Sequence, residues 1–474
     1  MEKQLDMKYL LLSFCLMVLQ SCTSEKEIST FEKLKEYEGL YEYHNNSKLE
    51  MAVSPRDSTS IFALLGGSKY QLKLVAQDTF LNASEQKVVF IRNDSGNIIG
   101  YQEDGNDELL KLLTKEVYFP KEMWYPRLGF EGNDYTYQQP TGQNDGLIIG
   151  NIEDTPINTD LFEKMIKAII DEEYQDIHSV LIIYNGKLVA EEYFYEYDID
   201  TPHPMRSATK SYISLLAGIA LDQHIFKSTD EKVYPYFDGA NNFENFNNDK
   251  NNITLKHLLT QTSGLDCNDW DWNSAGNESK MAYENDWIKF ILDLPMIYKP
   301  GDSTQYCSGG VITIGRMIEE ASHQDLKSFA DNYLFGKLGV SNYDWHFKPD
   351  LSSAETFCQL SLRPRDIAKF MLMIDNKGRW NGKQIVSSDW VTESTNFHVT
   401  LDNTEYGYLW WRPYLQVENK RFDAILATGN GGQKAYIWKD LNLITIFNGG
   451  NYNKDSRVQE LLVKYILPSF EETE

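Results

Sequence analysis

The stretch Pro204-Met205-Arg206-Ser207-Ala208-Thr209-Lys210 stands directly before the apolar run Tyr212–Leu221. This run is apolar nearly all round and has the length of a buried helix. Because proline does not fit inside a helix, the helix is predicted to begin close to Ser207. Ser207 and Lys210 then lie one turn apart on the same face, near the positive end of the helix dipole.

A serine hydroxyl within reach of a lysine amine is typical of an activated nucleophile. For this role the lysine must be desolvated enough to be neutral part of the time. The same S-x-x-K spacing also fits a plain helix start with a capping serine and a solvated lysine. It occurs by chance in many long chains, so the other motifs decide between the two interpretations.

The composition limits the classes of function. The chain has 474 residues, of which 42% are hydrophobic and 13% aromatic, enough for a large core and more than one domain. The formal net charge of −25 argues against binding to nucleic acid and to anionic membrane surfaces. No group of cysteines and histidines has the spacing of metal ligands, so no metal site is predicted, and no cofactor is expected.

The first residues have the pattern of a targeting signal. Lys8 precedes the apolar run Leu10–Leu19, which is too short to span a bilayer but fits a signal peptide. Leu19-Gln20-Ser21-Cys22 resembles a bacterial lipobox, which implies lipidation of Cys22. The alternative is ordinary secretion with an incidental cysteine. We expect a lipoprotein of the bacterial cell envelope, in the outer membrane and facing the periplasm or the surface, with the lipid anchor as its only membrane contact.

The predicted organisation after the signal peptide (residues 1–22) has four parts. Residues 23–36 are polar and predict a tether. Residues 37–125 contain short alternating runs such as Tyr70–Leu74 and predict a small antiparallel sheet or barrel. Residues 126–155, with several glycines and a proline, predict a linker. A second domain is predicted for residues 156–468.

The second domain combines helical and strand patterns. A helical apolar pattern covers 161–170, and Asn185-Gly186 between two apolar runs predicts a β-hairpin. With the helix that follows Ser207, these elements predict an α+β domain in which a core helix packs on an antiparallel sheet.

Two later loops carry candidate site residues. The stretch Pro300–Gly310 brings Tyr306 and Ser308 to the start of an apolar helix, and the glycine-rich stretch Ala427–Gln433 leads into a strand. Of the cysteines after Cys22, Cys267, Cys307 and Cys358 allow at most one disulfide among them. Cys307 is interpreted as a small buried hydrophobe rather than a nucleophile.

These motifs, in this order, resemble the serine β-lactamase and penicillin-binding superfamily. The similar branch is the class C-like group that includes esterases, D-aminopeptidases and 6-aminohexanoate-dimer hydrolase. His257–Leu265, Arg363–Asp366 and Tyr406–Trp411 also look like that group. The resemblance covers roughly 156–468. It implies an α+β fold with an antiparallel sheet flanked by helices and a helical lobe, here preceded by a small all-β domain.

The resemblance also implies roles for single residues. Ser207 resembles the acylated nucleophile, and Lys210 resembles the group that takes or relays its proton. Tyr306 resembles the second proton-transfer group, which a nearby cation must tune. Ser308 is expected to hydrogen-bond Lys210 or substrate.

The oxyanion hole would combine the N–H of Ser207 with an N–H of the glycine-rich strand. Two alignments compete for that strand. The preferred one places Asn430, Gly431 and Gly432 in the third motif with Gln433 as donor, and the other uses Ala427-Thr428-Gly429. The strand lacks the basic residue that helps β-lactamases hold a substrate carboxylate, so neutral amides or esters are favoured as substrates.

The leading hypothesis is a serine hydrolase that acts on a small-molecule amide or ester, or a short peptide, through an acyl-enzyme on Ser207. The alternatives are a D-amino-acid peptidase or β-lactamase acting on peptidoglycan-like substrates, and a non-catalytic binding lipoprotein of the same fold. An α/β-hydrolase is disfavoured because no G-x-S-x-G motif is present. Trp270 and Trp272 either line the cleft or pack within their loop. The oligomeric state is not predicted.

Overall fold

The computed structural model describes residues 30–43, 48–65, 68–237, 243–281, 284–347 and 359–470. The predicted signal peptide with Cys22 lies outside these residues, as does Cys358. Within the described ranges, no helix has the length and apolar character needed to cross a membrane.

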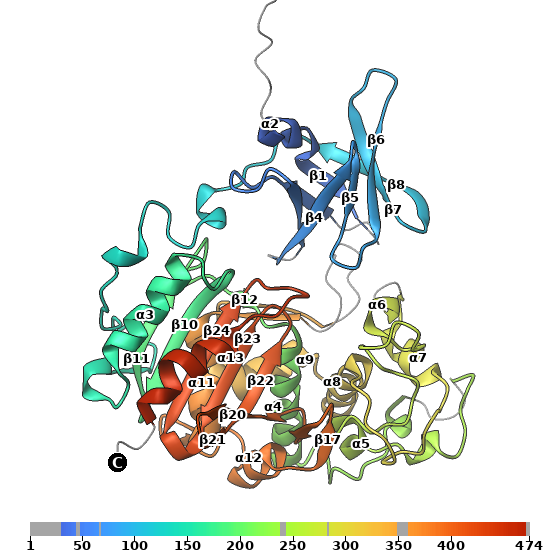
Figure 1. Cartoon of the computed structure of the whole chain (residues 1–474). Coiled ribbons are helices and arrows are strands. Elements are labelled where there is room, and N and C mark those ends of the chain that lie inside the picture. Colours follow the sequence, from blue (N-terminus) through green and yellow to red (C-terminus); the bar gives the residue numbers. More distant parts are fainter. Residues whose placement is uncertain are drawn as a thin grey trace, which may run out of the picture.

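The N-terminal β region is a closed eight-stranded barrel, called the barrel below (Figure 1). It closes through pairing of Tyr41 with Leu112, and Leu40 with Thr114. The prediction of a small all-β domain is therefore confirmed. The strands are β1 (Gly39–Glu42), β2 (Lys48–Ala52), β3 (Ser60–Leu65), β4 (Ser68–Ala76), β5 (Thr79–Leu81), β6 (Lys87–Arg92), β7 (Ile98–Glu103) and β8 (Asn106–Thr114).

The predicted tether is partly structured. Thr30–Leu34 form helix α2, which is followed by the 3-10 helix η1 (Lys35–Tyr37). Leu34 and Tyr37 are buried in the barrel core, because the apolar side chains of this amphipathic turn face the barrel interior. This half of the predicted tether therefore belongs to the barrel.

The segment 115–158 connects the barrel to the C-terminal domain (residues 159–470), and it is not the free linker predicted for 126–155. The Tyr135 hydroxyl donates to Glu192 at 2.5 Å, and Arg365 donates to the carbonyl of Thr141 at 2.6 Å. These buried polar contacts hold the segment against the sheet. Its elements are η3 (Lys121–Trp124), η4 (Gly132–Asp134), β9 (Ile148–Ile149) and η5 (Ile152–Asp154).

A nine-stranded sheet forms the centre of the C-terminal domain, in the order β17-β18-β19-β22-β23-β24-β10-β11-β9. Neighbouring strands are antiparallel except β9 and β11. The bounds are β10 (Ile177–Tyr184), β11 (Lys187–Tyr193), β17 (Val399–Leu401), β18 (Thr404–Tyr406), β19 (Trp411–Arg412), β22 (Ile425–Gly429), β23 (Gln433–Trp438) and β24 (Leu443–Gly449). Smaller pairings involve β12 (His203–Pro204), β13 (Tyr343–His346), β14 (Gln359–Leu362), β15 (Arg379–Trp380), β16 (Lys383–Gln384), β20 (Tyr414–Val417) and β21 (Lys420–Asp423).

Helices cover both faces of this sheet, so successive residues of its central strands are buried on opposite sides. Val180 and Ile182 of β10 share a core with α3 (Thr159–Ile170) and α13 (Val458–Leu461). Leu181 and Ile183 share the other core with α4 (Thr209–Asp222), α8 (Ser308–Ser322) and α11 (Pro364–Asp375). The predicted α+β class, with an antiparallel sheet flanked by helices, is confirmed.

The helical lobe follows α4 and lies beside the sheet (yellow-green in Figure 1). Its elements are η7 (Tyr234–Phe237), η9 (Lys250–Asn252), α5 (Leu255–Leu259), α6 (Glu278–Met281) and α7 (Trp287–Asp293). Helices α9 (Leu326–Ala330), η10 (Asp331–Phe335), α10 (Gly336–Leu338) and α12 (Ser388–Thr395) complete the domain, with η11 (Lys439–Leu441), η12 (Leu462–Ile466) and η13 (Leu467–Phe470).

Candidate active site

Ser207 lies in a short 3-10 helix, η6 (Arg206–Ala208), that leads directly into α4. The preceding Arg206 has a φ of +50°, a conformation that non-glycine residues rarely adopt and that often marks functional sites. Lys210, one turn later, donates from Nζ to Ser207 Oγ at 3.1 Å. The structure therefore brings the predicted serine and lysine into direct contact.

Lys210 is buried, and its charge is balanced by neighbouring groups. Burial lowers the pKa of Lys210, but Tyr306, Glu278 and Asp269 outweigh it and hold the pKa above the usual 10.5. The amine is therefore protonated near neutral pH. The sequence argument expected burial to make the lysine partly neutral, and it did not consider the carboxyl groups that act with Tyr306 against this effect of burial.

Tyr306 faces the lysine from the loop before α8. The Lys210 Nζ lies 4.6 Å from the centre of the Tyr306 ring. Trp270 stacks on the Tyr306 ring, with centroids 4.7 Å apart and planes 3° apart. The centre of the Trp411 ring lies 6.1 Å from the centre of the Tyr306 ring. Trp270 is still 53% exposed, so it forms part of the outer surface of the site, whereas Trp272 is 66% exposed and has no described ring contact.

Two acidic residues, Asp269 and Glu278, complete the site next to Ser308. Ser308 Oγ donates to Glu278 Oε2 at 2.8 Å, not to Lys210 as one expectation had it. Asp269 accepts from the backbone N–H of Ser308 at 2.7 Å and of Glu278 at 3.0 Å. Burial and the adjacent Glu278 raise the pKa of Asp269 to about 7, against the opposing effects of Lys210 and Ser308.

The sequence argument missed this acidic pair. The available signal was the polar loop between Asp266 and Glu278, where attention went only to its tryptophans. A buried lysine requires a countercharge, so acidic residues in the loop preceding the Tyr306 motif were candidates for that partner.

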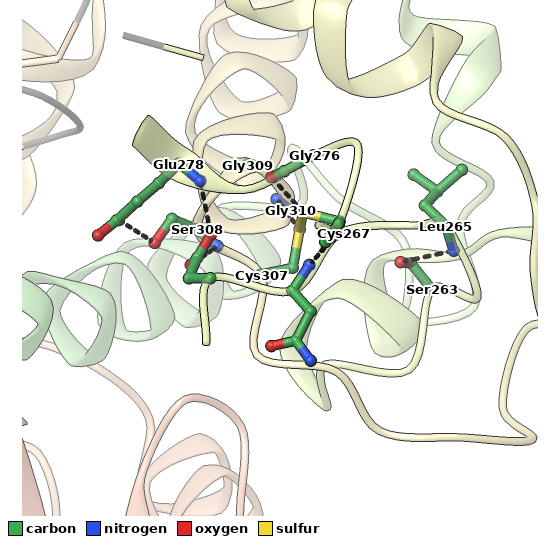
Figure 2. Close-up of a disulfide and its surroundings, with 12 residues drawn as sticks. Ser263, Leu265, Cys267, Gly276, Glu278, Cys307, Ser308, Gly309 and Gly310 are labelled. Atoms are coloured by element: carbon green, nitrogen blue, oxygen red, sulfur yellow. Dashed lines mark hydrogen bonds between the residues drawn. A yellow bond between two sulfur atoms is a disulfide. The ribbon is translucent and has the colours of Figure 1, made fainter. Parts of the chain in front are cut away.

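A disulfide joins the two loops that carry these groups. Cys267 and Cys307 are bonded across 40 residues of sequence. Figure 2 shows the bond beside Ser308 and Glu278. Cys307 is buried, as predicted, and its bond to Cys267 leaves no free thiol to act as a nucleophile. Its position directly after Tyr306, and that of Cys267 just before Asp269, fixes the two loops against each other.

The glycine-rich strand end approaches the nucleophile through Gly429. A Cβ added at Gly429 would lie 2.3 Å from the carbonyl oxygen of Met205 and 3.1 Å from the N atom of Ala208. Added Cβ atoms at Gly431 and Gly432 would instead meet Tyr452 and Ser456. The geometry therefore favours the alignment through Ala427-Thr428-Gly429.

The residues of the preferred alignment have other contacts. The buried Gln433 side chain donates to the carbonyls of Asn430 and Gly449 at 3.0 and 2.7 Å. The Asn430 side chain exchanges hydrogen bonds with Asn453. The spacing of the glycines in the sequence does not show which of them faces Ser207. That depends on the turn between β22 and β23.

A lysine reaches the same strand end from β23. Lys434 pairs with Thr428 in the sheet register and donates from Nζ to Thr428 Oγ1 at 3.4 Å. Burial lowers the pKa of Lys434, and Asp455 partly counters this. Lys434 is therefore a basic side chain beside the glycine-rich strand end that the sequence argument did not consider.

Comparison with known proteins identifies the family of the C-terminal domain. A sequence model of the family described as Beta-lactamase matches residues 167–460. The chain belongs to the β-lactamase family. Among curated relatives, "Protein flp" of Staphylococcus aureus (strain MRSA252) is 26% identical over 184 residues. The match spans only 36% of each chain.

Solved structures share the fold of this β-lactamase-family chain. A putative beta-lactamase from Bacteroides dorei DSM 17855 is 19% identical, with a TM-score of 0.52 over 66% of this chain and 99% of that one. A family VIII carboxylesterase is 14% identical, with a TM-score of 0.51 over 65% and 96% of the two chains. At these identities the likeness shows the fold alone. Across the described residues, no group of three or more His, Cys, Asp or Glu side chains is arranged to hold a metal ion.

Proposed function

We propose that the protein is a serine hydrolase that cleaves an ester or amide through an acyl-enzyme on Ser207. The observation that carries this is the 3.1 Å contact from Lys210 Nζ to Ser207 Oγ, with the Tyr306 ring 4.6 Å from the same Nζ. Such a cluster can move a proton at the atom that attacks.

The proposed reaction has two steps. Ser207 Oγ bonds to the substrate carbonyl carbon, its proton passes through the Lys210 and Tyr306 pair to the leaving group, and the bond to that group breaks. Water then attacks the acyl-enzyme, which releases the acid and returns a proton to Oγ. Tyr306 and the acidic pair raise the pKa of Lys210, and a charged Lys210 stabilises negative charge that develops at the carbonyl oxygen.

Covalent labelling tests this function. A fluorophosphonate probe is expected to label wild type and to fail on Ser207→Ala. Ser214→Ala is the matched control, because Ser214 is buried on the same helix and its hydroxyl has no hydrogen-bond partner. Absence of labelling in folded wild type by both fluorophosphonate and penicillin probes would contradict the proposal and favour a binding protein.

The second candidate, a β-lactamase or D-amino-acid peptidase, is favoured by Lys434. A cation beside Thr428 at the strand end can attract a substrate carboxylate. If this function holds, penicillin labels Ser207 and Lys434→Met reduces labelling by about tenfold, which corresponds to one lost charged hydrogen bond. Labelling by fluorophosphonate alone would reject this candidate and retain the ester or amide hydrolase.

We also propose that the chain is a lipoprotein of the bacterial cell envelope, anchored at Cys22. The apolar run before Cys22 supports this, and the Cys267–Cys307 disulfide suits an oxidising compartment. Growth with an alkyne-labelled fatty acid is expected to label wild type and not Cys22→Ser. Equal labelling of both, or of neither, would contradict the anchor.

A further inference from the structure

A cavity of about 830 Å³ lies between the barrel and the C-terminal domain. Barrel side chains, among them Leu49, Met51 and Ala63, line one part of it, and Arg206, Tyr452 and Ser279 line another. This volume is within the range of small-molecule sites. Both domains therefore line the cavity. Two of its lining residues, Arg206 and Ser279, are the sequence neighbours of Ser207 and Glu278.

Aromatic side chains pack together in one part of the barrel core. Tyr37, Phe80 and Phe90 pack together there, with ring centroids between 4.8 and 5.5 Å apart, and Leu34 of α2 lies in the same cluster. The smaller Ala63 and the aliphatic Leu72 belong to the same core cluster and also line the cavity. Eight-stranded barrels are just wide enough either to be filled by side chains or to hold one small ligand.

A buried hydroxyl in this cavity has no partner. Tyr101 lines the cavity and is fully buried, and its Oη makes no hydrogen bond. His178, also buried and lining the cavity, has a second such atom, Nε2. Buried polar atoms are nearly always hydrogen-bonded, so these two atoms indicate a missing partner in the cavity.

Arg206 connects the cavity to the nucleophile. Its guanidinium donates to the Tyr70 hydroxyl at 2.8 Å and also to the Ser68 hydroxyl, both on β4. It also lies 4.8 Å from the centre of the Tyr452 ring. Arg206 directly precedes Ser207 in the chain. The residue that contacts the barrel is therefore bonded to the proposed nucleophile.

We propose that the barrel is the binding site for the apolar part of the substrate. This rests on the proposed hydrolase function. The occupant is an elongated, largely aliphatic group that carries a hydrogen-bonding atom for Tyr101, and its ester or amide carbonyl lies at Ser207. The substrate class is therefore an amphiphilic ester or amide rather than a short acetyl ester. The apolar barrel side chains of the lining exclude water from the aliphatic chain, whereas charged side chains such as Lys69 and Asp176, which also line the cavity, suit a polar end of the substrate. The Arg206 contacts hold the barrel next to the serine.

The test uses the full chain and two readouts. Binding of 11-(dansylamino)undecanoic acid to the Ser207→Ala protein is followed by fluorescence. Hydrolysis of p-nitrophenyl decanoate and p-nitrophenyl acetate is compared in proteins with an intact serine. Ala63→Phe fills the cavity from inside, and Ala76→Phe, at an exposed position of β4, is the matched control.

Ala63→Phe is expected to weaken probe binding by about tenfold and to lower the decanoate-to-acetate ratio of kcat/KM by the same factor. Acetate hydrolysis and the Ala76→Phe control stay within about twofold of wild type. Tyr101→Phe removes only an unpartnered hydroxyl, so it is expected to fold even where Ala63→Phe does not. It is expected to weaken probe binding by about threefold.

Unchanged probe binding and an unchanged ratio in the folded variants would overturn the proposal. Failure of the hydrolase function gives a different result, namely no turnover of either ester while Ser207→Ala still binds the probe. If neither Ala63→Phe nor Tyr101→Phe changes the affinity for the probe, the probe binds outside the barrel. This outcome would also contradict the proposed binding site.

Discussion

The two walls of the site are held in place by different means. The wall formed by η6 and α4 presents Ser207 and Lys210, and side-chain packing fixes it, since every residue from Thr209 to Ala220 is buried. The opposite wall consists of two loops that present Asp269 and Tyr306. The Cys267–Cys307 bond and hydrogen bonds to carboxylates fix these loops. The position of Ser207 thus depends on local helix geometry. The positions of Asp269 and Tyr306, which raise the pKa of Lys210, depend on a crosslink between residues far apart in the sequence.

The largest expected effect comes from the helical wall. Lys210→Met removes the partner of Ser207 Oγ and leaves Asp269 and Glu278 without their buried cation. We expect kcat/KM to fall by about a thousandfold, measured with a chromogenic ester. Lys250→Met is the matched control, because Lys250 is also buried but donates to Leu292 in the helical lobe. A comparable loss in both variants would contradict a specific role for Lys210.

A smaller loss of activity is expected when the contact between the end of β22 and the helical wall is disturbed. Gly429→Ala places a Cβ against the Met205 carbonyl and is expected to shift Ser207. A displacement of this kind costs about a hundredfold in kcat. Gly142→Ala is the control, since the nearest described atom to its added Cβ is 3.9 Å away. Wild-type activity in Gly429→Ala would show that the strand end does not set the serine position.

Breaking the crosslink tests the loop wall alone. The double variant Cys267→Ser/Cys307→Ser is expected to lose about 2–4 kcal/mol of unfolding free energy. Activity is expected to fall by about tenfold, because Tyr306 and Asp269 lose their common anchor. Dithiothreitol should lower the activity of wild type and leave the double variant unchanged. Equal sensitivity of both proteins would mean that the bond does not organise the site.

The smallest effect on activity is expected for the acidic residue of the loop wall, which is tested through the slope of stability with pH. The pKa of Asp269 is raised from the usual 3.8 to about 7 in the folded protein. The unfolded chain therefore loses this proton first as the pH rises, so the contribution to stability is full below about pH 4 and is lost by about pH 7. Asp269→Asn is expected to remove this fall in denaturant titrations, whereas Asp271→Asn, exposed on the same loop, retains it. An unchanged slope in Asp269→Asn would contradict the assignment.

The two walls also differ in how far the sequence predicts them. Pro204, the apolar run and the S-x-x-K spacing predict the helical wall correctly, because helix periodicity is a local property. The order of the motifs indicates Tyr306 as well. The contact of Ser308 with Glu278, the charge on Lys210 and the choice of Gly429 arise from groups far apart in the sequence. No local pattern specifies such distances, and a countercharge for a buried lysine is inferred only once its burial is known.

The Arg365 cluster also has a consequence for truncation. This buried guanidinium binds Glu191 of the sheet together with Asp145 and the Thr141 carbonyl of the connecting segment. A shortened protein that starts at residue 156 removes two of these three partners and also uncovers the sheet edge where β9 pairs with β11. We therefore expect a stable fragment to start upstream of Tyr135, and a cut at residue 156 to expose a sheet edge that favours aggregation.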